Sequence, residues 1–198
     1  MARPQKVSDD EILAVARRSF LDHGSGCPTA KIAEELGVSQ AALFKRFGTK
    51  QQLMMRALLP PPSPPWATIA GAGPDERPIE EQLREIAESM LTFFVQMLPC
   101  ITLLRGSGTV DEEALLGHFD VPPPVVGHRA MTDWFERAMA AGRIRRCDGS
   151  TLAFNFIGAF HGRVMINHIT RGHFGPVDVA TYAEQTVDLL MRGLEVST

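Results

Sequence analysis

The chain has 198 residues, of which 44% are hydrophobic and 22% charged, and a formal net charge of −3. It is long enough for one domain with its own core, or for a small domain joined to a larger body. Cys27, Cys100 and Cys147 are odd in number and far apart, which argues against a disulfide framework or a zinc site and favours a reducing cytoplasm. We expect no metal, no cofactor and, without a long apolar N-terminal segment, no signal peptide.

The first predicted helix runs from Ser8 to His23. Ser8-Asp9-Asp10-Glu11 has the spacing of a capping box, in which a serine and a glutamate satisfy each other's backbone amides. Apolar residues then recur at helical spacing: Ile12, Val15, Ala16 and Phe20. Gly24 follows and ends the helix.

Two short helices joined by a tight turn are predicted over residues 29–47. Ile32 and Leu36 form the apolar side of the first helix, and Leu43 and Phe47 form that of the second. This is the pattern of a helix-turn-helix unit. An ordinary helical hairpin with a solvated basic face has the same pattern, so flanking residues are needed to separate the two interpretations.

The turn and the second helix have the chemistry of a DNA reader. Gly37 supplies a positive φ at the helix end, and Ser39 offers its hydroxyl to the amides of the next helix. That helix leaves polar and small side chains exposed: Gln40, Ala41, Ala42, Lys45 and Arg46. Glutamine can bond an adenine edge, alanine can contact a thymine methyl, and lysine and arginine can reach phosphate or guanine.

A second capping box, Thr49-Lys50-Gln51-Gln52, begins a helix predicted over residues 49–59, which Pro60 ends. Local charge agrees with a DNA partner although the whole chain is slightly negative. Up to Arg56 there are nine Lys or Arg and six Asp or Glu, whereas the remainder has eleven and seventeen. Phosphate binding needs positive charge only where the protein touches the duplex.

The order and spacing of residues 6–58 resemble the TetR family of bacterial transcription regulators. The resemblance rests on Ile12 to Phe20 with Gly24, and on Thr29, Ile32-Ala33, Gly37-Val38-Ser39, Leu43-Phe44, Phe47, Lys50 and Leu53. It implies that the DNA-binding residues are Thr29, Ser39, Gln40, Ala41, Ala42, Phe44, Lys45, Arg46 and Lys50. Of these, Thr29, Phe44, Arg46 and Lys50 would hold the sugar-phosphate backbone, and Gln40, Ala41, Ala42 and Lys45 would read bases.

Two departures from the family pattern predict a lower affinity for each half-site. Phe44 stands where the family usually has tyrosine, so one hydroxyl bond to phosphate is lost. Pro28 stands where serine or threonine is common, which removes a hydroxyl and an amide from the start of the unit's first helix.

The rest of the chain is predicted to be helical, since no strand-like alternation persists. A proline-rich and then Gly- and Ala-rich run over residues 60–74 predicts a stiff interdomain loop, or alternatively a polyproline ligand for another protein. Long helices are predicted over residues 75–98, 122–142, 150–170 and 178–194, with a short helical turn over residues 112–119. Pro99 should break or kink the first of these, and Ser89 to Leu104 is too short for a membrane span.

We therefore predict an all-α protein with a helix-turn-helix DNA-binding domain over residues 1–48. A larger helical domain over residues 49–198 would bind an effector and dimerise, and the helix over 49–59 would connect the two. The segment 150–170 is apolar on nearly every side, so it must be covered on more than one face. An interface of four helices between two chains would cover it, with these residues in contact: Phe156, Phe160, Val164, His168, Val187, Leu190 and Met191.

Family members typically bind a small effector in the second domain. Aromatic and methionine side chains make adaptable apolar walls, so an apolar or amphipathic effector would contact Phe93, Phe94, Met97, Trp134, Met139 and His161. Each of these residues is also a good core residue, and that interpretation stays open. His161 and His168 are two helical turns apart, which is too far for one metal ion.

The resemblance implies a cytoplasmic repressor that binds a pseudo-palindromic operator as a homodimer. An effector would move the helix over residues 49–59 and change the separation of the two reading helices. A helical adaptor that uses the proline segment is one alternative. An enzyme that uses His161 or Cys100 is another, although no catalytic arrangement supports it.

Overall fold

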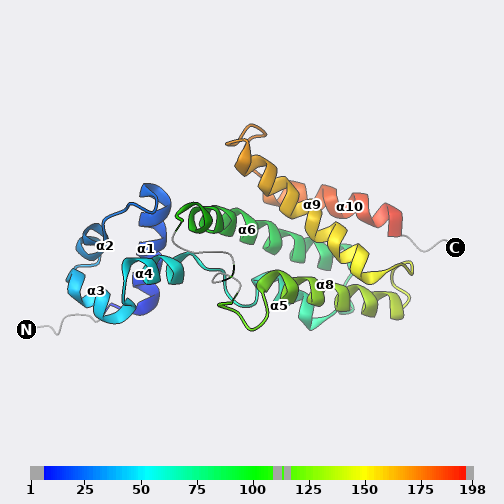
Figure 1. The fold of residues 1–198 in the computed structure, drawn as a ribbon. Helices are drawn as coiled ribbons and strands as arrows, with labels where there is room; N and C mark the ends of the chain where they lie inside the picture. Colours follow the sequence, from blue (N-terminus) through cyan, green and yellow to red (C-terminus); the bar gives the residue numbers. More distant parts are fainter. Residues whose placement is uncertain (1–6, 109–112, 114–116, 195–198) are drawn as a thin grey trace, which may run out of the picture. The chain divides into compact units, whose positions relative to one another are not determined.

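The computed structural model describes residues 7–108, 113 and 117–194, and these residues form helices joined by turns and loops, with no strand among them (Figure 1). The helices are α1 Asp9–His23, α2 Thr29–Glu35, α3 Gln40–Phe47, α4 Lys50–Leu58, α5 Pro65–Ala72, α6 Ile79–Gly106, α8 Pro123–Ala140, α9 Gly149–Ile169 and α10 Val179–Leu194. The prediction of an all-α fold is confirmed. The short turn predicted over residues 112–119 falls largely outside the described residues.

The chain forms two compact units. The N-terminal unit comprises Met1–Leu59 and Pro99–His118, and the C-terminal unit comprises Pro60–Leu98 and Phe119–Thr198. Helix α4, which we expected to connect two domains, packs against α1 and α3 within the N-terminal unit. By this packing the first unit extends beyond residue 48.

Reciprocal caps begin two helices of the N-terminal unit. The Ser8 hydroxyl accepts a hydrogen bond from the Glu11 amide at 3.1 Å, and the Glu11 carboxylate accepts one from the Ser8 amide at 2.7 Å. Thr49 and Gln52 repeat this exchange at the start of α4. Both capping boxes are therefore as predicted. The apolar sides of α1 and α4 then pack together, with Ile12, Ala16, Phe20, Leu53, Met54, Ala57 and Leu58 buried.

The prediction of an interdomain loop over residues 60–74 is wrong for residues 65–72, which form α5. Pro65 occupies the first turn of α5, where its missing amide has no helical partner to lose, and Pro64 is the residue before it. Trp66 and Ala70 of α5 lie in the core of the C-terminal unit, where α5 packs against α8. Burial of this indole thus turns a proline-rich stretch into a helix.

Helix α6 continues through Pro99, so of the break or kink predicted there the break is wrong. A proline removes the hydrogen bond to the carbonyl four residues earlier, at Val95, and Val95 is 43% exposed, so this turn of the helix lies at the surface. Among the described helices α6 alone is long and apolar enough to cross a membrane. Its Leu83, Met90 and Leu91 lie in the core of the C-terminal unit, as in the core helix of a globular protein.

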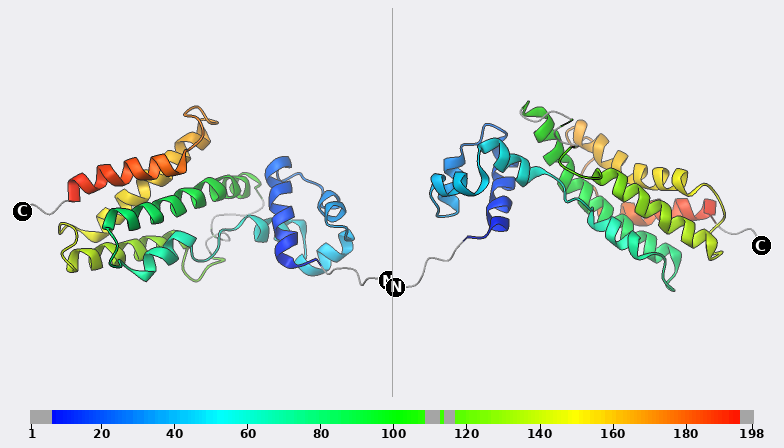
Figure 2. Two further views of the ribbon diagram at one scale, coloured as in Figure 1. Left: turned by 180° about the vertical axis from the view of Figure 1, so that it is seen from behind. Right: turned by 60° about the horizontal axis from the view of Figure 1, so that its bottom comes forward.

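A chain of aromatic rings runs through the core of the C-terminal unit. Neighbouring rings meet edge to face, with centroids 5.4 Å apart for Trp134 and Phe135, 5.8 Å for Phe135 and Phe156, and 5.0 Å for Phe156 and Phe160. Phe160 in turn meets Tyr182 of α10 at 6.0 Å. These contacts join α8, α9 and α10 into one bundle (Figure 2).

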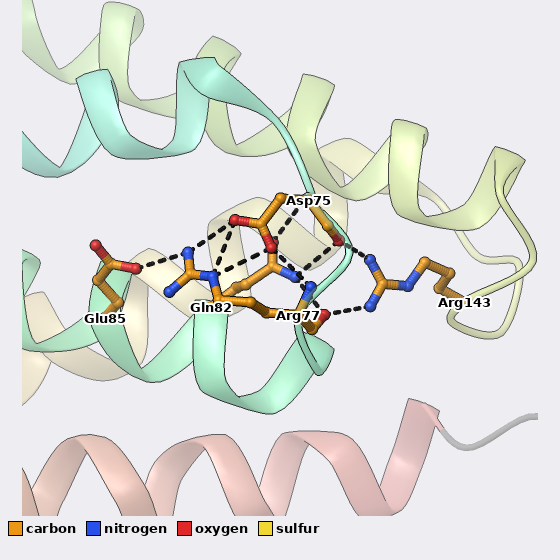
Figure 3. Close-up of polar contacts among 5 residues, drawn as sticks. All are labelled: Asp75, Arg77, Gln82, Glu85 and Arg143. Atoms are coloured by element: carbon orange, nitrogen blue, oxygen red, sulfur yellow. Dashed lines mark hydrogen bonds and ion pairs between the residues drawn. The ribbon is translucent and has the colours of Figure 1, made fainter.

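A buried glutamine closes the loop that leads into α6 (Figure 3). The Gln82 amide nitrogen donates to the carbonyls of Asp75 at 3.1 Å and Arg77 at 2.6 Å, and its oxygen accepts from the Asp75 amide at 2.9 Å. Arg143 donates to the same two carbonyls, and Arg77 pairs with Asp75 at 2.9 Å and Glu85 at 3.0 Å. The network fixes the first turn of α6 against the loop before it.

Candidate nucleic-acid interface

The turn between α2 and α3 is set by Gly37. This residue has a φ of +64°, and around it the Val38 amide donates to the Ala33 carbonyl at 3.0 Å while the Gly37 amide donates to the Glu34 carbonyl at 3.0 Å. These two bonds close the end of α2 in a Schellman motif. Ser39 then caps α3 by accepting from the Ala42 amide at 3.1 Å. The turn chemistry is as the sequence predicted.

Helix α3 has one buried and one exposed side. Leu43 and Phe47 are 1% and 3% exposed and hold the helix against the unit. Since successive residues turn by about 100°, the opposite side is centred on Lys45, between Ala41 and Ala42, with Phe44 and Arg46 at its edges and Gln40 next to the buried side. Ala41, Lys45 and Gln40 are exposed, Ala42 is half-buried, and Phe44 is 36% exposed. This exposed side is a helical surface of small and polar residues that can enter a major groove.

Thr29 and Gln40 do not act independently. Thr29 is only 4% exposed, and its hydroxyl oxygen accepts a hydrogen bond of 2.6 Å from Nε2, the side-chain amide nitrogen of Gln40. A residue expected to hold phosphate and a residue expected to read a base are thus joined to each other across the turn. Sequence reasoning missed this contact, because nothing in the spacing of the two residues indicates which side chains meet.

Arg46 is tied to the start of α1. Its guanidinium donates to the Val7 carbonyl at 2.6 Å and forms an ion pair with Asp9. Its side chain is 31% exposed, on the edge of α3 that faces α1 rather than in the middle of the exposed surface. The structure therefore gives Arg46 a role in holding α3 to α1.

Lys45 and Lys50 are the lysines that the unit presents at and beside α3. Lys45 is exposed and Lys50 is half-buried, and within residues 7–108, 113 and 117–194 neither forms a hydrogen bond or an ion pair. Ser39 is exposed, but its hydroxyl oxygen is already used as the cap of α3. At and beside α3, these two lysines therefore have charge available for a phosphate.

The residues expected to line an effector pocket divide into two groups. Trp134, Met97 and Met139 are buried, at 1%, 6% and 8% exposed, and belong to the core. Phe93, Phe94 and His161 are half-buried and lie together, with Phe94 meeting Phe93 at 5.8 Å and His161 at 5.2 Å between ring centroids.

Trp66 joins this group, with its ring centroid 6.4 Å from that of Phe94. Sequence reasoning missed Trp66, although Pro at its N-terminal side is a signal for a helix start.

The residues expected at a dimer interface lie mostly inside the chain. Phe156, Phe160, Val164 and Val187 are at most 6% exposed, as core residues of the C-terminal unit, so they have no surface left for a second chain. Leu190 and Met191 are half-buried against that core, and His168 is half-buried. The apolar residues that α9 and α10 leave in solvent are different: Phe154, Ile166, Ile169 and Leu189.

Two observations concern a metal site and Cys100 as a nucleophile. No three His, Cys, Asp or Glu side chains there lie close enough to hold a metal ion. Burial raises the pKa of the Cys100 thiol, which disfavours the thiolate that a nucleophile needs.

Comparison with known proteins places these residues in a family. Residues 12–57 match the family model described as "Bacterial regulatory proteins, tetR family", a range that covers α2 and α3 and most of α1 and α4. No curated protein matches the sequence.

Solved structures of TetR-family regulators have the same fold along nearly the whole chain. A regulator from Mesorhizobium loti aligns with a TM-score of 0.69 at 17% identity, covering 95% of this chain and 96% of that one. TetR regulators from Streptomyces coelicolor and Thermus thermophilus, the latter named PfmR, both align with a TM-score of 0.60, at 24% and 22% identity. They cover 96% and 94% of this chain and 100% of each of those chains.

Proposed function

We propose that this chain, a member of the tetR family of bacterial regulatory proteins, is a cytoplasmic repressor that binds a pseudo-palindromic operator as a homodimer under the control of a small effector. The family makes it a DNA-binding regulator of transcription rather than an enzyme. One observation carries the proposal beyond the family. The exposed side of α3 combines small side chains, which allow close approach, with the unpaired Lys45.

In this proposal α3 enters the major groove by that side. Ala41 and Ala42 approach the base edges, Gln40 bonds a base, and Lys45 and Lys50 neutralise phosphates. Two copies related by a twofold axis would place their α3 helices about 34–36 Å apart, which is one turn of the duplex and gives the operator its inverted repeat.

The experiment that tests this is selection of bound fragments from genomic DNA, followed by footprinting and titration in salt. We expect a protected inverted repeat and a complex that weakens as salt rises. Ala41→Asp, on the exposed side of α3, should abolish binding. Ala140→Asp, an exposed alanine of α8, should leave it intact. Binding by the Ala41→Asp variant equal to wild type would exclude α3 as the reading helix.

The proposed dimer is supported by a stripe along α9. Phe154, Gly158, Gly162, Ile166 and Ile169 follow one another at intervals of four, four, four and three residues, which places them on one side of the helix. A Cβ atom at either glycine would meet nothing within 4 Å. Apolar side chains at both ends and an open backbone in the middle allow a second helix to approach closely. We propose this stripe, with Leu189 of α10, as the contact between copies.

The proposed effector site lies where Trp66, Phe94 and His161 meet. The indole nitrogen of Trp66 is buried and has no hydrogen-bond partner among the described residues, although a buried N–H normally has one. An effector with an apolar body and one acceptor atom would satisfy it, with aromatic contacts from Phe94 and His161. Coupling of about 1–3 kcal/mol between effector and operator would lower DNA affinity roughly five- to 150-fold. Trp66→Phe should reduce the effector response in a gel-shift titration and leave DNA binding without effector unchanged.

A further inference from the structure

We infer that Thr29 sets base specificity indirectly, by fixing the amide of Gln40 in the orientation that reads adenine. The inference rests on the proposed function and deepens it, since it assigns Thr29 a positioning role in place of a phosphate contact. The contact between the two side chains is the starting point, because its length of 2.6 Å makes it a close hydrogen bond.

Thr29 is placed for this task by the start of α2. The residue before it is Pro28, and α2 begins without a side-chain cap, so the Thr29 hydroxyl is not used to cap its own helix. The side chain is 4% exposed, which leaves almost no surface for a phosphate group. Gln40 is the first residue of α3 and lies on the edge of its exposed side nearest to the buried residues, so its side chain can reach back to α2.

The hydrogen-bonding groups that remain on Gln40 match adenine. The amide nitrogen carries two hydrogens, and one of them is donated to Thr29. One N–H and the carbonyl oxygen are left. In the major groove, adenine offers the N7 acceptor and the N6 amino donor, which is the complementary pair. Thr29 therefore leaves Gln40 with the two groups that a bidentate contact to adenine needs.

Thr29 also restricts the side chain before DNA arrives. A free glutamine on a helix surface samples many rotamers and can turn its amide over, which exchanges donor and acceptor. Immobilising such a side chain on binding weakens affinity by roughly two- to tenfold. With Thr29 in place much of that ordering is done before DNA arrives, in the orientation that leaves one N–H and the carbonyl oxygen of Gln40 for the base.

The test measures binding to duplexes that carry each of the four base pairs at each operator position, at several salt concentrations. Gln40→Ala should lose the preference for adenine at one position of each half-site. Thr29→Val should reduce that preference roughly two- to tenfold at the same position, with an unchanged salt dependence. Thr29→Ser keeps the hydroxyl and should behave as wild type. On the Gln40→Ala background, Thr29→Val should have no further effect on specificity.

Other outcomes would overturn the inference. If Thr29→Val weakens all duplexes equally and flattens the salt dependence, Thr29 contacts phosphate. If its effect persists on the Gln40→Ala background, it acts without Gln40. A wild-type protein with no sequence preference would overturn the proposed function itself, which is a different result. The wild-type protein alone gives a second measurement: by NMR, the Gln40 side-chain amide should exchange more slowly than that of the exposed Gln51, and equal exchange would contradict the contact.

Discussion

The indole of Trp66 lies directly against the backbone of Gly127. A Cβ atom built at position 127 would stand 2.3 Å from Cη2 and 2.6 Å from Cζ2 of that indole. Both residues are in the core of the C-terminal unit, so neither can move into solvent. Helix α5 can pack this closely on α8 only because position 127 has no side chain.

Gly127→Ala should therefore destabilise the protein by about 1–3 kcal/mol, since the extra methyl overpacks a dense core. Urea unfolding followed by circular dichroism measures this. The matched control is Gly71→Ala on α5, where an added Cβ meets nothing within 4 Å and a helical alanine should stabilise by about 0.5–1 kcal/mol. Equal effects of the two variants would contradict the close packing.

Gln82→Ala should cost about 1–3 kcal/mol, because it removes three hydrogen bonds and leaves the Asp75 backbone amide without its partner, while Arg143 still donates to the two carbonyls. Thermal and urea unfolding both report the loss. Gln185→Ala, at an exposed position of α10, is the control and should change stability by less than about 0.5 kcal/mol. A Gln82→Ala protein as stable as the control would mean that the loop is held by Arg143 alone.

Asp75 gives the C-terminal unit an acid-sensitive contact. Hydrogen bonds from Arg77 hold the pKa of the Asp75 carboxyl below its ordinary value of 3.8. The folded state therefore favours the carboxylate, so this stabilisation is present above the pKa of the unfolded chain and is lost as pH falls through the lower, folded value. In urea, the wild-type midpoint should exceed that of Asp75→Asn at pH 6, and the difference should shrink toward pH 3. Asp22→Asn is the surface control, and a constant difference for Asp75→Asn would refute the assignment.

Lys45 and Arg46 are adjacent in the sequence, but their substitution should affect different properties, namely DNA binding for Lys45 and folding stability for Arg46. Lys45→Met should flatten the slope of log affinity against log salt by about 0.9 for each phosphate contact removed, and leave stability unchanged. Arg46→Met breaks the pair with Asp9 and the bond to Val7, so it should lower stability by roughly 0.5–1 kcal/mol. Its salt slope should stay closer to that of wild type. If instead Arg46→Met flattens the salt slope and Lys45→Met lowers stability, then Arg46, and not Lys45, contacts the phosphates.

The dimer proposal makes a prediction for α9 and α10. Ile169→Glu and Leu189→Glu each add a charge to a side chain that is 66% or 71% exposed, so both variants should fold. Each should raise the dimer dissociation constant by at least about thirtyfold, the effect of losing an interface hot spot. Light scattering during gel filtration at micromolar concentration distinguishes monomer from dimer. Val125→Glu on α8 is the control, and variants that stay dimeric would remove this surface from the interface.

The helix-turn-helix unit could be predicted from the sequence because its caps and turn depend on local contacts. Ser8, Gly37 and Thr49 act on amides and carbonyls a few residues away, so their spacing alone indicates where helices begin and end. The apolar pairs of α2 and α3 add the direction of burial. Contacts across the turn are not encoded in this way, and the bond between Thr29 and Gln40 could only be seen in the folded unit.

The predictions from sequence failed where tertiary packing determines the structure. The prolines before Trp66 led us to predict a linker, whereas Pro65 begins a helix whose indole is buried against Gly127. Along α9, apolar residues occur on both sides, so periodicity cannot say which side packs inside the chain. Phe156 and Phe160 pack inside, while Phe154 and Ile169 stay in solvent.

Helix α2 has seven residues and no side-chain cap. A helix so short is unstable by itself in water, so α2 depends on the burial of its own Ile32 and Ala33 against the rest of the unit. Its amide protons should exchange through a partial opening of the N-terminal unit, well before those of α1. Binding of α3 to DNA would suppress this partial opening. Operator binding should therefore slow amide hydrogen exchange in α2, the helix beside the groove.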